Sequence, residues 1–200
     1  MKVIITGATG LVGEGVLLVC LESPAVTEVL LINRKPLARK HEKLNELILN
    51  DFSAIDQYSE QVREYDACFF CAGSSSIGED EESFTRKTVG FVVPFAQTLA
   101  QANPAMTFIY VSGNRTDSTE QGNVMWARVK GRTENALLKV PFKAVYTFRP
   151  GFMKPVKGQH NVRFIYRIFE IFYPLWSVIL QNWACTMREV GLAMINCVTT

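Results

Sequence analysis

Three glycines near the start of the chain, Gly7, Gly10 and Gly13, have a spacing that suits phosphate binding. They lie between one apolar run, Val3–Ile5, and a second, Gly15–Leu21. Where a buried strand turns into a helix, backbone N–H groups and the positive end of the helix dipole face an anion. We expect Gly7 to permit the tight turn, Gly10 to let a pyrophosphate approach the backbone, and Gly13 to bring the helix close to the sheet. An ordinary strand-to-helix loop is the alternative, because the spacing G-x-x-G-x-x-G differs from the commoner fingerprint.

The next apolar run, Val26–Ile32, predicts a second strand. Its end lies about twenty residues beyond the glycines, where a dinucleotide fold binds the adenosine ribose and an acidic side chain accepts from a free 2′-hydroxyl. The chain has Asn33, Arg34 and Lys35 there instead. A guanidinium suits a 2′-phosphate through charge-assisted hydrogen bonds, so the sequence favours NADP over NAD as the cofactor. The alternative is that Arg34 and Lys35 are solvated loop residues.

Apolar strands alternate with helical stretches along the chain, which is typical of parallel βαβ units. Further strands are expected at 46–50, 67–71, 106–112 and 144–148, and further helices at 54–62, 84–100 and 123–139. The pattern predicts an α/β fold, a doubly wound parallel sheet of the Rossmann type in a single domain. Ligands of such sheets bind outside the carboxyl ends of the strands, so the residues there should converge on one crevice. These residues are the glycine turn, Arg34, Asp51–Phe52, Cys71–Gly73, Ser112 and Pro150–Gly151.

In their order and distribution these motifs resemble the short-chain dehydrogenase/reductase superfamily, and the resemblance covers essentially the whole chain. It is strongest to the small atypical NAD(P)-binding branch, whose members are similar to epimerases and to NAD(P)H-binding proteins. Ile5–Gly13 is similar to the cofactor turn, Tyr110–Gly113 to the strand with the catalytic serine, and Trp126–Gly131 to the segment with Tyr-x-x-x-Lys. The resemblance implies that Asp51 and Phe52 contact the adenine. The cofactor-binding residues that it implies are Gly7, Thr9, Gly10, Leu11, Val12, Gly13, Asn33, Arg34, Lys35, Asp51, Phe52, Cys71, Ala72, Gly73, Lys130, Pro150, Gly151 and Phe152.

The same resemblance implies Ser112, Trp126 and Lys130 as the catalytic positions. In the family a tyrosine hydroxyl exchanges a proton with the substrate oxygen, and the lysine one helical turn later binds the ribose and lowers the pKa of that phenol. Trp126 stands in place of the tyrosine. An indole N–H donates a hydrogen bond but does not serve as a general acid near neutral pH.

Each of these positions also has a plainer interpretation. Ser112 either orients a carbonyl or only ends its strand, since serine is common in caps and turns. Lys130 either binds the ribose or pairs with Glu134 on the solvated helix surface. Trp126 either takes part in the reaction or only forms the floor of the nicotinamide pocket. Tyr110, two residues before Ser112, is expected to be a core aromatic residue rather than a replacement for the missing tyrosine.

Two classes of function fit this sequence. The first is an NADP-dependent oxidoreductase that acts on an unidentified small carbonyl or hydroxyl substrate, with proton transfer rearranged through Ser112 and water. The second is a non-catalytic NADP(H)-binding sensor or regulatory protein, which Trp126 favours because the loss of a positioned acid typically lowers a rate ~10²–10⁴-fold.

The last part of the chain, residues 152–200, is expected to form a substrate region and a short helical cap. Aromatic side chains recur at helical spacing over 164–172, with Arg163 and Arg167 on another face. This amphipathic pattern fits a lid over the crevice, a surface for a partner protein, or a membrane-surface helix. Another apolar-faced helix is expected over 188–198.

The composition is that of an ordinary globular protein, with 48% hydrophobic and 20% charged residues. The five cysteines are scattered through apolar runs, and Cys68 and Cys71 would face opposite sides of a strand, so reduced thiols are expected. The two histidines suggest no metal site. The first hundred residues are net acidic and the second hundred net basic, but the basic residues are spread singly and no nucleic-acid partner is expected. A strand that begins at residue 2 and the absence of a transmembrane run favour the cytoplasm, and both a monomer and a homodimer remain open.

Overall fold

The computed structural model describes residues 1–162 and 184–199, and its centre is a six-stranded parallel sheet. The strand order is β3-β2-β1-β4-β5-β6, with every neighbouring pair parallel. The strands are β1 (Lys2–Thr6), β2 (Glu28–Asn33), β3 (Leu44–Ile48), β4 (Ala67–Phe70), β5 (Thr107–Val111) and β6 (Ala144–Phe148). This is the order of a dinucleotide-binding sheet, and it confirms the α/β, doubly wound fold expected from the sequence.

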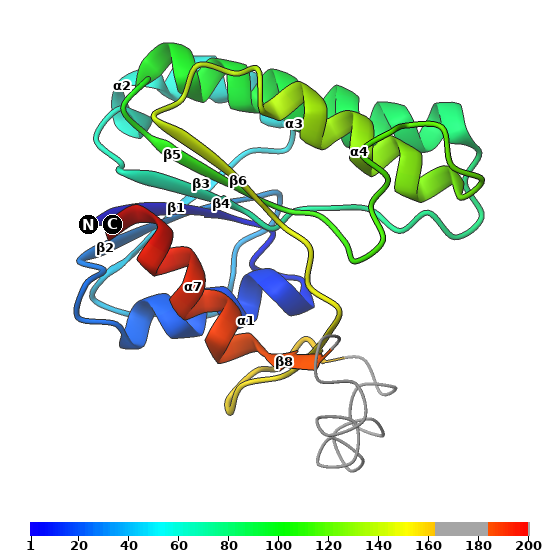
Figure 1. Ribbon diagram of the computed structural model, residues 1–200. Helices are drawn as coiled ribbons and strands as arrows, with labels where there is room; N and C mark the ends of the chain where they lie inside the picture. The colour runs from blue at the N-terminus through cyan, green and yellow to red at the C-terminus, as the bar shows by residue number, and fades with distance from the viewer. Residues whose placement is uncertain (163–183, 200) are drawn as a thin grey trace.

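Helices cover both faces of the sheet (Figure 1). On one face lie α1 (Leu11–Glu22) and α7 (Met187–Thr199); on the other lie α2 (Ser59–Val62), α3 (Glu81–Ala102) and α4 (Met125–Leu137). The central strands are apolar without alternation because both of their faces are buried under these helices.

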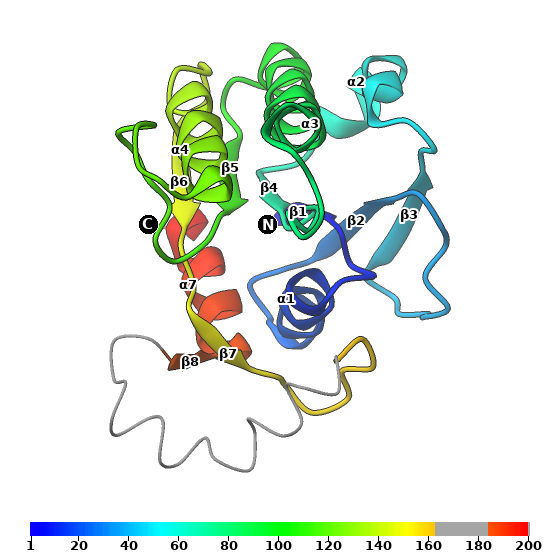
Figure 2. The same ribbon diagram turned by 90° about the vertical axis from the view of Figure 1, so that its right-hand side faces the viewer.

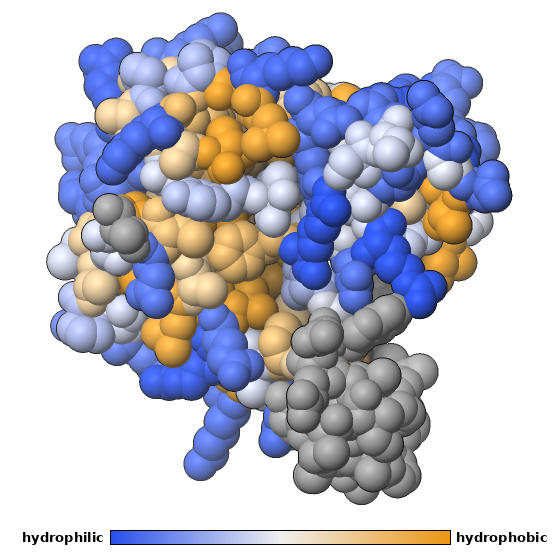
Figure 3. All heavy atoms as spheres, in the orientation of Figure 1, coloured by the Kyte–Doolittle hydropathy of each residue, from blue (hydrophilic) through white to orange (hydrophobic). Residues whose placement is uncertain are grey.

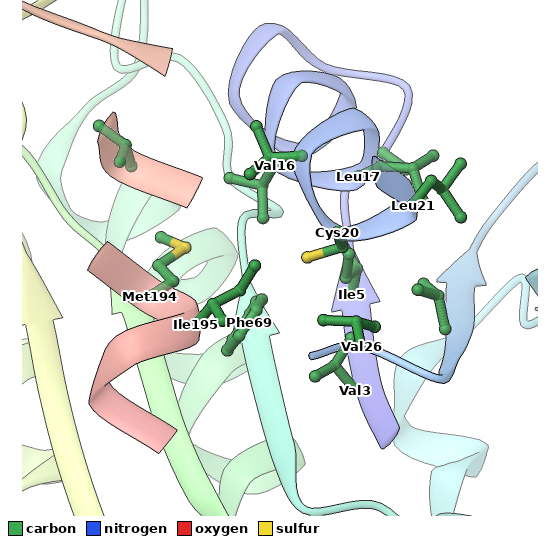
Figure 4. Close-up of a cluster of buried hydrophobic side chains, with 14 of the residues drawn as sticks. Val3, Ile5, Val16, Leu17, Cys20, Leu21, Val26, Phe69, Met194 and Ile195 are labelled. Carbon is green, nitrogen blue, oxygen red and sulfur yellow. The ribbon is translucent and has the colours of Figure 1, made fainter. Parts of the chain in front are cut away.

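The core between α1, α7 and the sheet is aliphatic (Figure 4). Val3, Ile5 and Leu17 are fully buried there. The two helices approach closely at small residues: a Cβ on Gly15 would lie 2.1 Å from the Met187 side chain. The docking of α7 on α1 therefore requires a glycine at this point of the first helix.

The opposite core, between α3, α4 and the sheet, is rich in phenylalanine. The rings of Phe70 and Phe95 pack edge to face with centroids 5.4 Å apart, and Phe52 stacks on Phe91 at 4.9 Å. Such aromatic pairs add packing energy beyond the apolar area that they bury. They fix α3 against the carboxyl half of β4, where the cleft described below lies.

The elements differ from the sequence expectations mainly at their ends. Strand β3 begins and ends two residues before the expected 46–50, and the expected helix over 54–62 is a 3-10 helix, η1 (Phe52–Tyr58), followed by the single turn of α2. Two short strands were not expected: β7 (Phe152–Lys154) and β8 (Ala184–Thr186), which pair in parallel. Helix α7 confirms the helix expected over 188–198, whereas the aromatic helix expected over 164–172 lies outside the described residues.

Strand β6 forms one edge of the sheet, and β3 forms the other. Figure 3 looks onto the β6 edge and shows apolar surface between the two helix layers. Tyr146 of β6 is 39% exposed. All five cysteines are free and are buried or half-buried. Within residues 1–162 and 184–199, no helix is long and apolar enough to cross a bilayer.

Candidate functional site

The glycine turn joins β1 to α1 and packs tightly against the turn after β4. Gly7 has a φ of +71°, and a Cβ there would lie 2.6 Å from the backbone nitrogen of Ala72. A Cβ on Gly13 would lie 2.2 Å from the carbonyl oxygen of Gly7. The contact at Gly7 confirms the expected tight turn. The contact at Gly13 lies between the first turn of α1 and the glycine turn itself, whereas the expectation for Gly13 was a close approach of the helix to the sheet.

Gly10 differs from the other two glycines because the space around it is open. A Cβ there would meet only the Gly7 carbonyl oxygen within 4 Å, at 3.3 Å. The backbone N–H of Gly10 donates to that same oxygen at 2.9 Å, and α1 begins at the next residue. The first N–H groups of a helix have no partner inside the helix, so α1 presents donors and the positive end of its dipole beside this open space.

A cleft of about 960 Å³ opens at the carboxyl ends of the central strands, which face the viewer in Figure 2. It extends from the glycine turn past the end of β2 to α3. Of the expected site residues, those that line it are Gly7, Thr9, Gly10, Asn33, Arg34, Lys35, Phe52, Cys71, Ala72 and Gly73. The sequence therefore predicted much of this cleft, and predicted that one crevice would contain residues from β1, β2 and β4.

Six other residues line the cleft. Ser74 belongs to the small-residue turn that the sequence predicts after the fourth strand, and five residues were missed: Asn50, Arg86, Lys87, Gly90 and Phe91. Four of them lie on α3, at positions where the pairs Arg86 and Gly90, and Lys87 and Phe91, are one helical turn apart. This i,i+4 spacing was a visible signal for a shared helix face. It did not show which face α3 turns toward the crevice.

The end of β2 combines an unsatisfied amide with two cations. Asn33 is 3% exposed, and neither its Nδ2 nor its Oδ1 has a hydrogen-bond partner among the described residues. Burying such a group without a partner costs free energy. Arg34 and Lys35 are exposed, and neither forms an ion pair with a carboxylate in the part of the chain that the structure describes.

Of the two residues expected to contact the adenine, Phe52 lines the cleft and Asp51 does not. Phe52 is 4% exposed and lines the cleft beside Phe91. Asp51 is exposed and does not line the cleft; its carboxylate accepts from the backbone N–H of Ser53 at 2.9 Å and so caps η1. That hydrogen bond lowers the pKa of the Asp51 carboxyl group.

Ser112 follows β5 and is 8% exposed. Its Oγ lies 2.9 Å from Thr116 Oγ1, which in turn donates to the carbonyl oxygen of Gly113 at 2.7 Å. Because the Thr116 proton goes to that carbonyl, Ser112 is the donor in the bond between the two hydroxyls. The lone pairs of Ser112 Oγ remain available as acceptors.

Trp126 and Lys130 lie one turn apart on α4, and both side chains lie close to Gly113. A Cβ on Gly113 would be 3.5 Å from Trp126 Cζ3 and 3.8 Å from Lys130 Cδ. The Nζ of Lys130 lies 5.6 Å from the centre of the Tyr110 ring, and burial lowers the pKa of Lys130 to about 8. Tyr110 itself is 2% exposed, and burial raises its pKa, so it is a core aromatic residue as expected.

Lys130 does not form the solvated surface pair with Glu134 that the sequence left open. Glu134 is 2% exposed and binds the guanidinium of Arg149 instead. No described acidic group lies within ion-pair distance of Lys130. Lys130 lines a small recess next to the cleft, and the two cavities share Ala72, Gly73, Ser74 and Lys87.

The remaining expected residues lie outside the lining of the cleft. These are Leu11, Val12, Gly13, Asp51, Ser112, Trp126, Pro150, Gly151 and Phe152. The carbonyl oxygen of Pro150 accepts from the N–H of Asn114 at 3.3 Å, which holds the turn after β6 beside the residues after β5. Among the described residues no group of three or more His, Cys, Asp or Glu could hold a metal ion.

Solved structures similar to this chain have the same type of fold. WbmH of Bordetella bronchiseptica, in complex with NAD+, shares 18% identity over 99% of this chain and 71% of that chain, with a TM-score of 0.66. DesIV, a dTDP-glucose 4,6-dehydratase from Streptomyces venezuelae with NAD bound, shares 17% over 98% of this chain and 71% of that chain (TM-score 0.63). The reductase domain of PhqB from Penicillium fellutanum shares 15% over 99% of this chain and 64% of that domain (TM-score 0.68).

The sequence identities to these solved structures are low, so they show the fold alone. A match to a family model is stronger evidence of the family. The model of the NAD dependent epimerase/dehydratase family matches residues 3–121, which contain the glycine turn, the end of β2 and the α3 wall of the cleft. From this match, the chain belongs to the NAD-dependent epimerase/dehydratase family.

Proposed function

We propose that the cleft binds NADP(H) in preference to NAD(H), and that the chain is an oxidoreductase for a small carbonyl or hydroxyl substrate. The lining of the cleft carries the cofactor part of this proposal. The glycine turn stands on one side of the cleft, Arg34 and Lys35 lie after β2, and no carboxylate is among the described lining residues. An acidic side chain after β2 would favour a free 2′-hydroxyl, whereas the guanidinium of Arg34 favours a 2′-phosphate.

Polar groups that have no hydrogen-bond partner among the described residues support the fit of such a cofactor. The amide of Asn33 can both donate to and accept from ribose hydroxyls, which would give its two buried atoms partners. The open space at Gly10 and the first N–H groups of α1, at Leu11 and Val12, suit a pyrophosphate. Phe52 provides an apolar wall for the adenine ring.

A bound NADP(H) would supply or accept the hydride, and the protein would position the groups around it. Lys130 would donate to the hydroxyls of the nicotinamide ribose, since its ammonium has no carboxylate partner among the described residues. Ser112 Oγ would accept from a substrate hydroxyl, but it can donate to a carbonyl only by leaving Thr116. The indole N–H of Trp126 would donate a hydrogen bond, but it would not give up its proton near neutral pH. The proton that the substrate oxygen needs would therefore come from another group or from water.

Calorimetric titration of the unmodified protein with NADP+ and with NAD+ tests the cofactor assignment. We expect NADP+ to bind about tenfold or more tightly, since a hydrogen bond to a charged group contributes ~1.5–3 kcal/mol. Arg34→Ala should remove most of this difference and leave NAD+ binding nearly unchanged. Equal affinities of the unmodified protein for the two cofactors contradict the assignment.

The second candidate function is a non-catalytic NADP(H)-binding sensor. Trp126, whose side chain lies beside Gly113 and Lys130 where the family places a tyrosine, favours it. NADPH that binds without being oxidised by any of a panel of small carbonyl compounds, and that protects the protein from limited proteolysis, would support the sensor. Steady oxidation of NADPH with one of these compounds would support the enzyme.

Residues 152–200 are proposed as the substrate and cap region of this site. Residues 159–161 of this region lie close to the glycine turn. The buried carboxylate of Glu14, one residue after Gly13, accepts from the backbone N–H groups of His160 at 2.8 Å and Asn161 at 2.7 Å. The chain that follows β7 is thereby fastened to the first turn of α1.

A further inference from the structure

Lys87 is the one lining residue of α3 that reaches both cavities. It lines the large cleft, and it also lines the recess that contains Lys130 and Tyr110. The turn Ala72–Ser74 after β4 is shared by the same two cavities. Lys87 therefore stands at the β4 side of the cleft, beside the point where the glycine turn touches Ala72.

The ammonium of Lys87 is bound by a carboxylate of the protein itself. Its Nζ lies 2.5 Å from Glu79 Oε1, and Glu79 Oε2 accepts from Ser83 Oγ at 2.6 Å. The hydrogen bonds from Lys87 and Ser83 lower the pKa of Glu79, so this group is an anion at neutral pH. The Lys87 side chain is 51% exposed and the Glu79 side chain 23%, and an ion pair that solvent reaches from the lysine side is weak enough to exchange partners.

We propose that Lys87 is a cofactor-binding cation for the pyrophosphate, and that Glu79 occupies it until the pyrophosphate takes its place. This inference rests on the proposed function, because it needs a dinucleotide in the cleft. In the free protein Glu79 neutralises a lysine of the cleft, and the described residues that line this cleft include no carboxylate. In the complex a phosphate oxygen accepts from Lys87, while Glu79 keeps its bond to Ser83.

The sheet order separates this cation from those at the end of β2. Strands β2 and β4 lie on opposite sides of β1, and Figure 2 shows their ends apart. Arg34 and Lys35 follow β2, where the 2′-phosphate is expected, whereas Lys87 lies beside the turn after β4. Lys87 should therefore act on the phosphates that NAD and NADP share, and Arg34 on the phosphate that only NADP has.

A double-mutant cycle with NADP+ and NAD+ as the two probes tests this inference. Lys87→Ala should weaken the binding of both dinucleotides by the same factor, about tenfold, since it removes a charge-assisted hydrogen bond. Glu79→Gln should tighten the binding of both about two- to fivefold, because a weak competing ion pair is lost. In the double variant, the Glu79→Gln change should have no further effect. Calorimetry gives the affinities, and thermal unfolding shows that each variant is folded.

A matched control is available outside the cleft. Glu64 forms an exposed ion pair with Lys2, 3.0 Å apart, at the opposite end of the sheet. Glu64→Gln should leave both affinities unchanged, which separates the local effect of Glu79 from the loss of one negative charge.

Three results would overturn the inference. A Lys87→Ala variant that loses affinity for NADP+ alone places Lys87 at the 2′-phosphate. A Glu79→Gln variant with unchanged or weaker binding removes Glu79 as a competitor. A Lys87→Ala variant that binds both probes like the unmodified protein, while Arg34→Ala loses the NADP+ preference, overturns the role of Lys87 and leaves the proposed function standing. If the unmodified protein binds neither dinucleotide, the proposed function falls as well.

Discussion

Glu134 of α4 is bound by Arg149, the residue directly after β6, and not by Lys130 on its own helix. The Glu134 side chain is 3% exposed, so Arg149 takes the place of the solvent that burial removes from this carboxylate. Arg149 also donates to Ser118 Oγ at 2.6 Å. One guanidinium thus joins α4, β6 and the loop between β5 and α4, and Lys130 is left without a carboxylate partner among the described residues.

Arg149→Ala should destabilise the fold because it leaves a buried carboxylate unpaired. Breaking a fully buried pair costs ~3–5 kcal/mol, and since the Arg149 side chain is 38% exposed we expect about 2 kcal/mol. Urea unfolding measures this loss. Arg188→Ala is the matched control, because its pair with Glu22 is exposed on both sides and should contribute little. Equal losses in the two variants would contradict the structural role of Glu134.

Lys130→Met should stabilise the protein at pH 7. Burial lowers the pKa of Lys130 to about 8, so the folded state at pH 7 holds a charged amine in a poorly solvated place. Since a pKa unit corresponds to ~1.36 kcal/mol and the pKa falls from about 10.4 to about 8, we expect a gain of about 3 kcal/mol. Between about pH 8 and pH 10.4 the unfolded state binds more protons than the folded state, so the unmodified protein gains stability as the pH rises.

The advantage of Lys130→Met over the unmodified protein should therefore shrink across this range. Urea unfolding at pH 7 and at pH 10 checks it, and a constant difference would show that the Lys130 amine is well solvated. The same variant should bind NADPH more weakly if Lys130 holds the ribose.

Gly10→Val should abolish cofactor binding without unfolding the protein. A Cβ on Gly10 would meet only the Gly7 carbonyl oxygen, at 3.3 Å, so a larger side chain needs a small shift in the free protein but would occupy the place proposed for the pyrophosphate. Gly7→Val is the contrasting variant: it combines a φ of +71° with a 2.6 Å approach to the Ala72 nitrogen and should unfold or strain the chain. Circular dichroism and calorimetry separate the two effects. Native Gly10→Val protein with undiminished binding would place the phosphate site elsewhere.

Trp126→Tyr should increase the oxidation of NADPH by small carbonyl compounds. The side chain of residue 126 lies against Gly113 beside Lys130, so a phenol there would lie next to an amine that lowers its pKa. Cofactor affinity should change little. The absorbance of NADPH at a fixed carbonyl concentration measures the rate. An unmodified protein that turns over faster than the tyrosine variant would show that Trp126 belongs to a different mechanism.

The sequence predicted those parts of the site that depend on local geometry. A buried strand that passes through a glycine turn into a helix packs in one common way, and the close contacts at Gly7 and Gly13 show this packing. The sequence also located the end of β2, because one helix of ordinary length separates the glycine turn from the second strand of a dinucleotide-binding fold. Phe52 was expected in the cleft because it follows the third expected strand, at the carboxyl edge of the sheet, and because the family resemblance implied a contact with the adenine.

The missed residues depend on tertiary packing. Arg86, Lys87 and Phe91 reach the cleft only because α3 turns one particular face toward β4, and phenylalanine packing decides that rotation. The spacing of a helix defines its faces but does not assign them to a neighbour. Strands β7 and β8 have three residues each, too few for any periodic pattern to indicate them.

Strands β7 and β8 pair in parallel, so Phe152 lies beside Ala184. The chain leaves the nucleotide-binding framework after β7 and rejoins it at β8, and both junctions are fixed by this short ladder and by the packing of α7 on α1. Glu14 of α1 also accepts from the backbone N–H groups of His160 and Asn161, so the chain that follows β7 is coupled to the helix that begins beside Gly10. A substitution that shifts residues 159–161 therefore reaches the glycine turn without touching any residue of the cleft lining.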